Sequence, residues 1–496
     1  MGFTYRRLTK DNTFSSDLSI LPVRLFLQKV FMNPVFEPLR LAAVATDIAL
    51  VNQATPADIA GRQATRLRRI LALAQRSSVV YRERVNGKTL HCSESDLLSG
   101  IPVVTREELM QRFDDWVTDP RLKLDELRAF TADPTRIGEP YLGRYVVWES
   151  SGTGGQPGMF VQDGEAMAVY DALEALRRSA PRPLGRWMDP LCLSERTAFV
   201  GATSGHFASY VTLERLCRLC PWMAQTTRSF SILQPTNALV SCLNAFNPTV
   251  IATYPTAAAL LADEAEKGNL QINLREIWTG GECLSPTVRA RVKQVMGCTV
   301  RNSYGASEFL ALGWECAEGH LHVNADWAIL EPVDERHRPV PPGELSCTVL
   351  LTNLANTVQP LIRYDLGDQV TLQTERCMCG SPLPVIEVQG RQDEPLVMTG
   401  DHGQLVTLLP LALTTVLEDQ ANVFDFQLRQ TGDHTLVLRL GLDGVAAEEA
   451  MARCRSVLHS FAASQGLGAL RVVGELGQPI PRGRSGKALR VIGRSL

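Results

Sequence analysis

The chain has 496 residues, too many for one hydrophobic core, so two or more domains are expected. Hydrophobic residues make up 45% and charged residues 21%, and the net charge of -3 gives no general attraction for nucleic acid or anionic lipid. The 12 cysteines follow an N-terminus too polar for a secretory signal, which favours reduced thiols in a cytoplasmic protein.

Residues 1–56 are expected to form an N-terminal helical extension. The segment 21–50 is apolar but interrupted by charged residues, so no run reaches the roughly 20 residues that a membrane span needs. We therefore expect helices that pack on the body of the protein and no membrane span, with contact to a membrane surface or a partner as the alternative.

Strand-like and helix-like segments then alternate over 57–390, the range expected to form a large domain. The strand 144–150 precedes a helix near 163–180, and strands near 196–202, 249–254 and 274–282 alternate with further helices. This alternation predicts an α/β fold with mixed or parallel sheets flanked by helices. Short strands and turns predict a β-rich subdomain at about 326–390. Residues 391–496 predict a small mobile α+β C-terminal domain.

A Gly-rich turn, SSGTGGQP at 150–157, lies between a predicted strand and a predicted helix. Small residues let backbone N–H groups approach phosphate oxygens, and the hydroxyls of Ser151 and Thr153 add further donors. A tight turn that only reverses the chain is the alternative. The glycine–lysine signature of a Walker loop is absent from this turn.

Four further motifs follow in order. In NSYGASE at 302–308, a Tyr can stack on a base and a Glu can hold Mg²⁺ or its waters. In RYDLGD at 363–368, an Asp can accept from both ribose hydroxyls. GRQD at 390–393 lies at the predicted domain boundary, and Lys487 lies in the Gly-rich segment PRGRSGKALR. Singly, each motif also fits an ordinary surface turn or a solvated side chain.

The order and spacing of these five motifs resemble the adenylate-forming superfamily of acyl-CoA synthetases, luciferases and peptide-synthetase adenylation domains. The chain is more similar to the phenylacetate–CoA ligase branch, which RSSVVYRER at 76–84 and DLLSGIPVVTREELMQRF at 96–113 also resemble. The resemblance covers about 57–496. It implies ATP-dependent activation of a carboxylic acid to an acyl-adenylate, with release of pyrophosphate, and then acyl transfer to coenzyme A.

The resemblance also implies roles for single residues. Lys487, Glu308 and Thr153 are expected to act in the reaction, Lys487 as the mobile lysine that bridges carboxylate and α-phosphate and Glu308 as the Mg²⁺ carboxylate. Asp393 is the expected hinge. The residues expected around ATP are Ser151, Gly152, Thr153, Gly154, Gly155, Gly280, Gly281, Glu282, Tyr304, Gly305, Asp368 and Arg391. Those expected around the acid are His206, Tyr254, Trp278 and Ser303.

Two features depart from the family pattern. The phosphate loop has Gly154 and Gln156 where the family usually has Thr and Lys, so one hydroxyl donor and one cation are missing. The first 50 residues have no counterpart in the family.

A group of cysteines and histidines predicts a structural Zn²⁺ site. Cys377 and Cys379 lie on a tight turn, and Cys316 and His322 lie upstream, with His320 as the alternative imidazole. Two thiolates, a third Cys and a His suit tetrahedral zinc. Buried reduced cysteines beside surface histidines are the alternative.

The residues expected near the acid are apolar or aromatic, so an aromatic acid is the expected substrate. The alternative acceptor is an amine or the phosphopantetheine thiol of an acyl or peptidyl carrier protein. A degenerate ATP-binding scaffold is the third interpretation, favoured by the altered phosphate loop and opposed by the presence of Glu308, Asp368 and Lys487. The oligomeric state is open, and a homodimer is compatible with the sequence.

Overall fold

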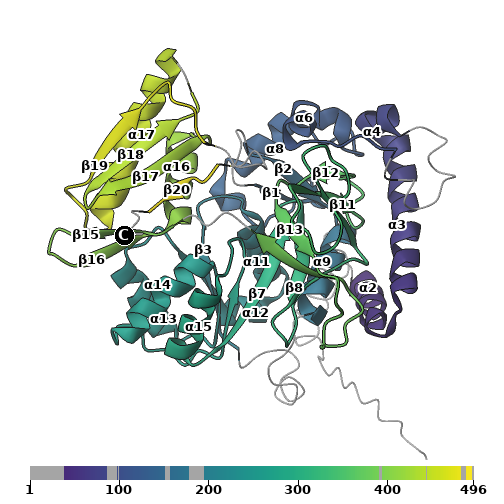
Figure 1. The fold of residues 1–496 in the computed structure, drawn as a ribbon, viewed down its shortest axis with the longest axis horizontal. Helices are drawn as coiled ribbons and strands as arrows, with labels where there is room; N and C mark the ends of the chain where they lie inside the picture. The colour runs from purple at the N-terminus through teal and green to yellow at the C-terminus, as the bar shows by residue number, and fades with distance from the viewer. Residues whose placement is uncertain are drawn as a thin grey trace, which may run out of the picture.

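A computed structural model describes residues 38–85, 98, 100–150, 157–177, 195–389, 394–442, 444–481 and 488–493. The chain forms a mixed α/β structure in which helices flank a large sheet and an α/β region follows at the C-terminal end (Figure 1). The expected fold class is therefore confirmed. Among the helices of these ranges, none is long and apolar enough to cross a membrane.

The N-terminal helices pack on the body of the protein. They are α2 (Pro38–Leu50), η1 (Val51–Gln53), α3 (Pro56–Ser77) and α4 (Val79–Arg84). Helix α3 begins with a capping box, because the Thr55 side chain accepts from the amide of Asp58 and the Asp58 carboxylate accepts from the amide of Thr55. Helix α2 packs against α9 (Gly164–Arg177), and Arg40 forms an ion pair with Glu165 of α9.

Short elements lead from α4 to the sheet. They are α6 (Arg106–Gln111), α7 (Phe113–Trp116), α8 (Leu124–Thr131), η3 (Pro134–Arg136), and the antiparallel pair β1 (Val146–Glu149) and β2 (Met159–Gln162). Trp116, Trp148 and Phe160 are fully buried in the first of two hydrophobic cores, which also receives side chains from α3, α9 and the strands after residue 300. This core connects the N-terminal helices to the β-rich part of the chain.

A nine-stranded sheet forms the centre of the molecule, in the order β13-β14-β9-β8-β7-β6-β5-β3-β4. Strands β4, β3, β5, β6 and β7 run parallel, whereas β8, β9, β14 and β13 continue the sheet antiparallel. The strands are β3 (Thr197–Gly201), β4 (Thr227–Ser231), β5 (Val250–Thr253), β6 (Glu276–Thr279), β7 (Thr299–Ala306), β8 (Phe309–Glu315), β9 (Leu321–Val323), β13 (Gln369–Leu372) and β14 (Val385–Gln389).

Helices connect the parallel strands, as the strand–helix alternation predicted. They are α11 (Ala208–Leu219), α12 (Pro221–Thr226), α13 (Thr236–Phe246), α14 (Pro255–Glu266) and α15 (Pro286–Met296). Helix α15 illustrates how the ends of these helices are set by capping residues. Ser285 accepts from the amide of Val288 at 3.2 Å, and Gly297 ends the helix in the left-handed conformation at φ 61°.

A small antiparallel sheet, β10-β11-β12, packs beside the large one. Its strands are β10 (Ala328–Val333), β11 (Thr348–Asn353) and β12 (Tyr364–Asp365). Strand β11 is buried along its whole length. The side chains of Asn353 at its end and of Asn356 and Gln359 after it donate to the Tyr170 hydroxyl and to backbone carbonyls of β2. Because each buried amide has a partner, this network can lie inside the protein at little cost.

The C-terminal region contains a four-stranded sheet in the order β19-β18-β17-β20 and the hairpin β15–β16. Its elements are β15 (Leu396–Thr399), β16 (Leu405–Leu408), α16 (Pro410–Ala421), β17 (Phe426–Gly432), β18 (Thr435–Leu440), α17 (Gly444–Ser464), β19 (Arg471–Glu475) and β20 (Val491–Ile492). It contacts the large sheet region where Ser204 donates to Asp419 at 2.6 Å and Gln465 donates to the carbonyl of Leu233 at 2.9 Å. Figure 1 shows it above α13 and α14.

Candidate active site

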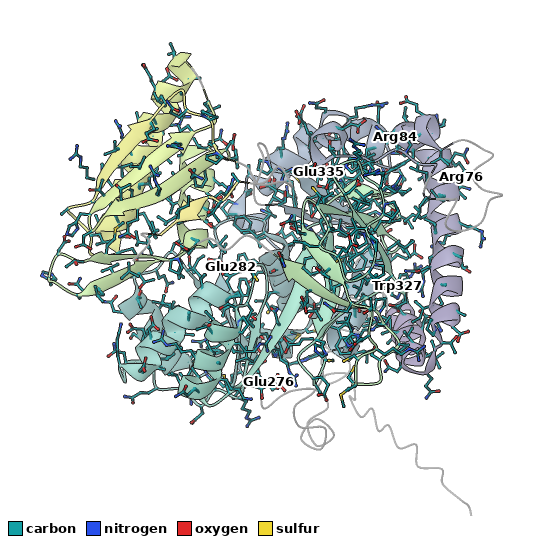
Figure 2. The ribbon with its side chains drawn as sticks, in the orientation of Figure 1. Arg76, Arg84, Glu276, Glu282, Trp327 and Glu335 are labelled. Atoms are coloured by element: carbon teal, nitrogen blue, oxygen red, sulfur yellow. The ribbon has the colours of Figure 1, made fainter. Side chains whose placement is uncertain are left out.

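The segment after β6 carries the residues expected near adenine. Gly281 has φ 77°, and a Cβ there would lie 3.0 Å from the ring of Tyr254, so only glycine fits. The Glu282 carboxylate accepts from the amide and the hydroxyl of Thr256, at 3.0 and 3.1 Å, at the first turn of α14. Glu282 lies nearer to the C-terminal region than Glu276 does, at the other end of β6 (Figure 2).

Tyr304 and Asp368 meet at the neighbouring strand. The Tyr304 hydroxyl donates to the Asp368 carboxylate at 2.9 Å, and the Tyr304 side chain is buried. Burial raises the pKa of Tyr304 well above its usual value, and the neighbouring Asp368 raises it further. The phenol therefore stays protonated and fixes one oxygen of Asp368, the residue expected at the ribose.

Glu308 is held in a fixed position close by. Its carboxylate accepts from the Tyr364 hydroxyl at 2.7 Å, and its carbonyl accepts from the Asn353 side chain at 2.9 Å. Burial, and then Glu308, raise the pKa of Tyr364 well above its usual value, so the phenol remains a donor. A carboxylate held in this way has the oxygen chemistry that Mg²⁺ prefers, so Glu308 fits the magnesium role expected for it.

The chain between Tyr304 and Glu308 turns very tightly. A Cβ on Gly305 would lie 2.1 Å from the backbone oxygen of Leu310, so no other residue fits without movement of the backbone. The pairing of β7 with β8 shifts register between Tyr304 and Ala306, which marks a bulge. A glycine is therefore required at position 305 by the close approach of the two strands. The bulge that it forms sets the separation between Tyr304 and Glu308.

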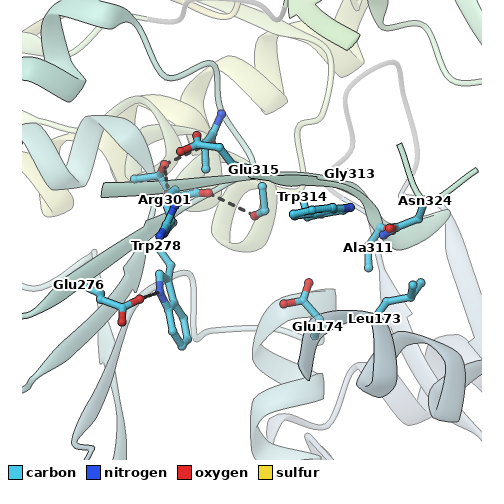
Figure 3. A pocket seen from close by; sticks show the side chains of 13 residues that line it. Leu173, Glu174, Glu276, Trp278, Arg301, Ala311, Gly313, Trp314, Glu315 and Asn324 are labelled. Carbon is cyan, nitrogen blue, oxygen red and sulfur yellow. Dashed lines mark hydrogen bonds between the residues drawn. The ribbon is translucent and has the colours of Figure 1, made fainter. Parts of the chain in front are cut away.

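A small pocket of about 40 Å³ lies beside these residues (Figure 3). Two of the four residues expected near the acid, Trp278 and Ser303, line it. His206 and Tyr254 are not among its lining residues. Tyr254 lies against Gly281 instead. The full lining is Leu173, Glu174, Glu276, Trp278, Thr279, Arg301, Asn302, Ser303, Ala311, Gly313, Trp314, Glu315 and Asn324.

His206 is buried behind Glu149 rather than in this pocket. Its ring lies 5.5 Å from that of Phe130, and its backbone oxygen accepts from the amide of Glu149 at 2.8 Å. Neither ring nitrogen has a hydrogen-bond partner within the described ranges. Burial lowers the pKa of His206 below its ordinary value, so the neutral ring is favoured.

Reasoning from the sequence missed Glu174, Glu276, Arg301 and Trp314 as pocket residues. A signal for two of them was present in the strand period. Glu276 lies two residues before Trp278 on β6, and Arg301 lies two residues before Ser303 on β7. Residues at i and i+2 of a strand share a face, so each expected pocket residue pointed to a second one.

The predicted metal ligands come together around one point. The ligand atoms of Cys316, His322, Cys377 and Cys379 all lie within 4.8 Å of one another. His322 Nδ1 lies 2.9 Å from the carbonyl of Leu383, which fixes the tautomer and leaves Nε2, 3.3 Å from Cys379 Sγ, as the ligand atom. His320 also approaches, with Nδ1 at 3.2 Å from Cys377 Sγ. Three sulfurs and one imidazole fit zinc.

Comparisons with known proteins agree with this arrangement. Residues 208–345 match the family model described as AMP-binding enzyme. Protein CapK of Staphylococcus aureus is 27% identical over 135 residues, which make up 27% of this chain and 28% of CapK, so the match spans under a third of that relative.

Two solved structures of 2-hydroxyisobutyryl-CoA ligase share the fold. The complex with 2-HIB-AMP and CoA in the thioesterification state has a TM-score of 0.58 at 20% identity, over 90% of this chain and 91% of that chain. The open conformation with the same ligands has a TM-score of 0.51 at 19% identity, over 87% and 90%. Residues 208–345 thus match an AMP-binding enzyme family, and the chain shares the fold of these ligases. The phenylacetate–CoA ligase branch stays a prediction.

Several residues that the superfamily pattern assigns lie outside the described ranges. They are Ser151, Gly152, Thr153, Gly154, Gly155, Arg391, Asp393 and Lys487. The base of the phosphate loop is described. Ser150 and Gly158 close it, because the amide of Ser150 donates to the carbonyl of Gly158 and the amide of Gly158 donates to Ser150 Oγ, both at 2.8 Å.

Proposed function

We propose that this protein activates a carboxylic acid with ATP as an acyl-adenylate, releases pyrophosphate and passes the acyl group to coenzyme A. The observation that carries the proposal is one juxtaposition. Glu308, in the turn between β7 and β8, and Asp368, just before β13, are fixed carboxylates near a pocket that β6, β7 and β8 line. Ser303 lines the pocket and the next residue of β7, Tyr304, holds Asp368 from the other face of the strand, so β7 contributes to both parts of the site.

The first step joins the acid to the nucleotide. A carboxylate oxygen attacks the α-phosphorus of ATP, the bond to the bridging oxygen of the β-phosphate breaks, and pyrophosphate leaves. Asp368 would hold the ribose, Glu308 would hold Mg²⁺, and the phosphate loop at 151–155 would hold the β- and γ-phosphates. Mg²⁺ supplies charge compensation at the triphosphate when it is bound. Positioning and charge compensation are what this chemistry needs from a protein.

The second step transfers the acyl group. A thiolate attacks the acyl carbon, the bond from that carbon to the adenylate oxygen breaks, AMP leaves, and the thiol proton goes to solvent. For the same site to serve both steps, residues 391–496 would act as a small domain that turns about Asp393 and carries Lys487 in and out. The separate sheet and helices of this range support that division.

Two indole rings, Trp278 and Trp314, line the acid pocket, which favours an aromatic acid. We place the chain in the phenylacetate–CoA ligase branch on the motifs at 76–84 and 96–113. A structural zinc ion at the cluster of Cys316, His322, Cys377 and Cys379 belongs to the same proposal. The ten cysteines described as free thiols are in keeping with a cytoplasmic protein.

The test measures the two half-reactions separately. Acid-dependent exchange of pyrophosphate into ATP, over a panel of aryl and aliphatic acids, is the expected sign of the first. CoA-dependent release of AMP is the expected sign of the second, and AMP release that needs a carrier protein or an amine would instead identify that acceptor. Protein that binds ATP but shows no exchange with any acid would be a scaffold, which the altered loop at Gly154 and Gln156 would then explain.

A further inference from the structure

Arg363 is a buried residue with a left-handed backbone conformation, directly before the tyrosine that holds Glu308. Its φ is 53°, a value that residues other than glycine rarely adopt because the Cβ atom crowds the following carbonyl oxygen. The next residue, Tyr364, begins β12 and donates to the Glu308 carboxylate at 2.7 Å. Such a conformation persists only where the surroundings fix it, so the contacts of Arg363 indicate what this position does.

The Arg363 side chain is anchored by two hydrogen bonds. Nη1 donates to the carbonyl of Ile101 at 2.8 Å, and Nε donates to the carboxylate of Glu331 at 3.3 Å. The Arg363 amide donates to Thr352 Oγ1 at 3.0 Å. Because the side chain is only 11% exposed, its planar guanidinium is held by these partners and not by water.

The N-terminal part of the chain holds the same segment through its backbone. The Arg363 carbonyl accepts from the amide of Val104 at 3.1 Å, and Val104 pairs with Tyr364 in a parallel bridge. The amide of Ile362 donates at 3.0 Å to the hydroxyl of Tyr81, a fully buried side chain of α4. The backbone on each side of Arg363 therefore has a defined position, which limits the directions open to the Tyr364 ring.

We propose that Arg363 is a positioning residue for the magnesium ion. Its side chain holds the left-handed turn that directs the Tyr364 hydroxyl onto Glu308, the carboxylate expected to bind the ion. This inference rests on the proposed function, because Glu308 receives its magnesium role there. A role of Arg363 in stability alone is the alternative, and it predicts a less stable protein with an unchanged response to magnesium.

The experiment measures the affinity of the full chain for ATP by calorimetry, once with Mg²⁺ and once with EDTA, so no turnover is needed. The magnesium ratio, defined as the first affinity divided by the second, is then compared between variants. Arg363→Ala keeps the unfavourable backbone position without its anchor, so the turn should relax and the ratio should fall by about tenfold, as for other residues that orient a metal ligand. Arg363→Gly accepts the left-handed conformation and should retain more of the ratio.

Tyr364→Phe provides the decisive comparison. It removes the hydroxyl that orients Glu308, so it should lower the magnesium ratio by about tenfold. If Arg363 acts through that hydroxyl, Arg363→Ala should add little further loss in the Tyr364→Phe background. The matched control is Arg215→Ala, which removes another buried guanidinium from an ion pair, with Asp171 at 2.8 Å. It should lower the thermal midpoint and leave the ratio unchanged.

A wild-type magnesium ratio in Arg363→Ala would overturn the inference, and so would losses that multiply in full in the double variant. A glycine variant no better than the alanine variant would show that the side chain does not act by holding the turn. An equal fall in Arg215→Ala would assign both arginines to stability. Should Arg363→Ala fail to fold, Arg363→Lys carries the same comparison, because an ammonium group does not reproduce the guanidinium geometry.

Pyrophosphate exchange separates this inference from the proposed function. Magnesium ratios that change as expected, without exchange for any acid, would support the role of Arg363 and remove the acyl-adenylate chemistry. Exchange in a wild-type protein that binds ATP equally well with Mg²⁺ and with EDTA would overturn the inference and keep that chemistry.

Discussion

Glu308 is the residue whose surroundings most constrain its role. The carboxylate is held by the hydroxyl of Tyr364, and the backbone carbonyl by Asn353. A glutamine side chain can still accept from Tyr364, so Glu308→Gln should fold normally while losing the charge that a divalent cation requires.

We expect Glu308→Gln to lower acid-dependent pyrophosphate exchange by roughly two to three orders of magnitude, as for other oriented charged groups. Tyr364→Phe is the control, because it removes only the bond that orients the carboxylate, and a smaller loss is expected. Saturating Mg²⁺ should not restore Glu308→Gln. If the two variants lose the same activity, the carboxylate acts through its hydrogen bond and not through a cation.

His206 gives a second prediction, on stability. Burial lowers its folded-state pKa below the ordinary value of 6.5. The unfolded chain therefore binds more protons just below pH 6.5, so the stability from the neutral ring is complete above that pH and is lost as the pH falls.

His206→Phe keeps a ring beside Phe130 and removes the titration. Urea unfolding from about pH 5 to about pH 8 should show a flatter decline on the acid side than the wild type shows. Parallel curves for the two proteins would mean that another group causes the acid loss.

At the scale of elements, the predicted zinc cluster joins segments that are distant in sequence. Cys316 follows β8, His322 lies in β9, and Cys377 and Cys379 lie between β13 and β14. With four protein ligands, no position is left for a substrate, so the metal is expected to stabilise this end of the sheet.

Protein purified without added metal should contain about one zinc ion per chain. Cys377→Ser should lose the metal and lower the thermal midpoint by roughly several degrees. Cys242→Ser is the control, since Cys242 is exposed on α13 and outside the cluster. Zinc content near zero in the wild type, with an unchanged midpoint in Cys377→Ser, would show that the cluster is only a group of thiols.

The sequence predicted the secondary structure best where apolar residues recurred with the period of a strand or a helix. The strand–helix alternation predicted β3, β5, α14, β6 and α15, and a tight Cys turn with a strand histidine predicted the four side chains that the structure brings together at 316, 322, 377 and 379. Helix α16 was not predicted, because nine of its residues are buried and its helical period is weak. Arg301 and Trp314 were missed because the alternation of a strand shows which residues share a face, but not whether that face lines a pocket or packs in the core.

At the scale of the molecule, Lys487 tests the two-step mechanism. It lies outside the described ranges, in the last segment of the chain. Lys487→Ala should lower adenylate formation by about two to three orders of magnitude, or about 3–4 kcal/mol. ATP binding should largely survive, because Tyr304 and Asp368, the proposed adenine and ribose contacts, lie outside residues 391–496.

The second half-reaction, from chemically supplied acyl-adenylate to thioester, should survive largely intact in the same variant. The small domain would by then have turned Lys487 away, and this turn must break the contacts of Ser204 with Asp419 and of Gln465 with Leu233. Equal damage to both half-reactions would assign Lys487 to the fold or the hinge. Little damage to either would remove it from the active site.

Trp314 has one further consequence. Its ring lines the pocket beside Ser303 and also stacks on His322 of the predicted metal cluster, with ring centroids 5.2 Å apart. If the cluster holds zinc, the metal would influence the shape of the pocket through this single ring. In a zinc-starved cell His322 would be released and Trp314 would lose the surface on which it rests. Loss of the metal would therefore alter the pocket wall at Trp314, whereas the hydrogen bond between Tyr304 and Asp368 would not depend on it.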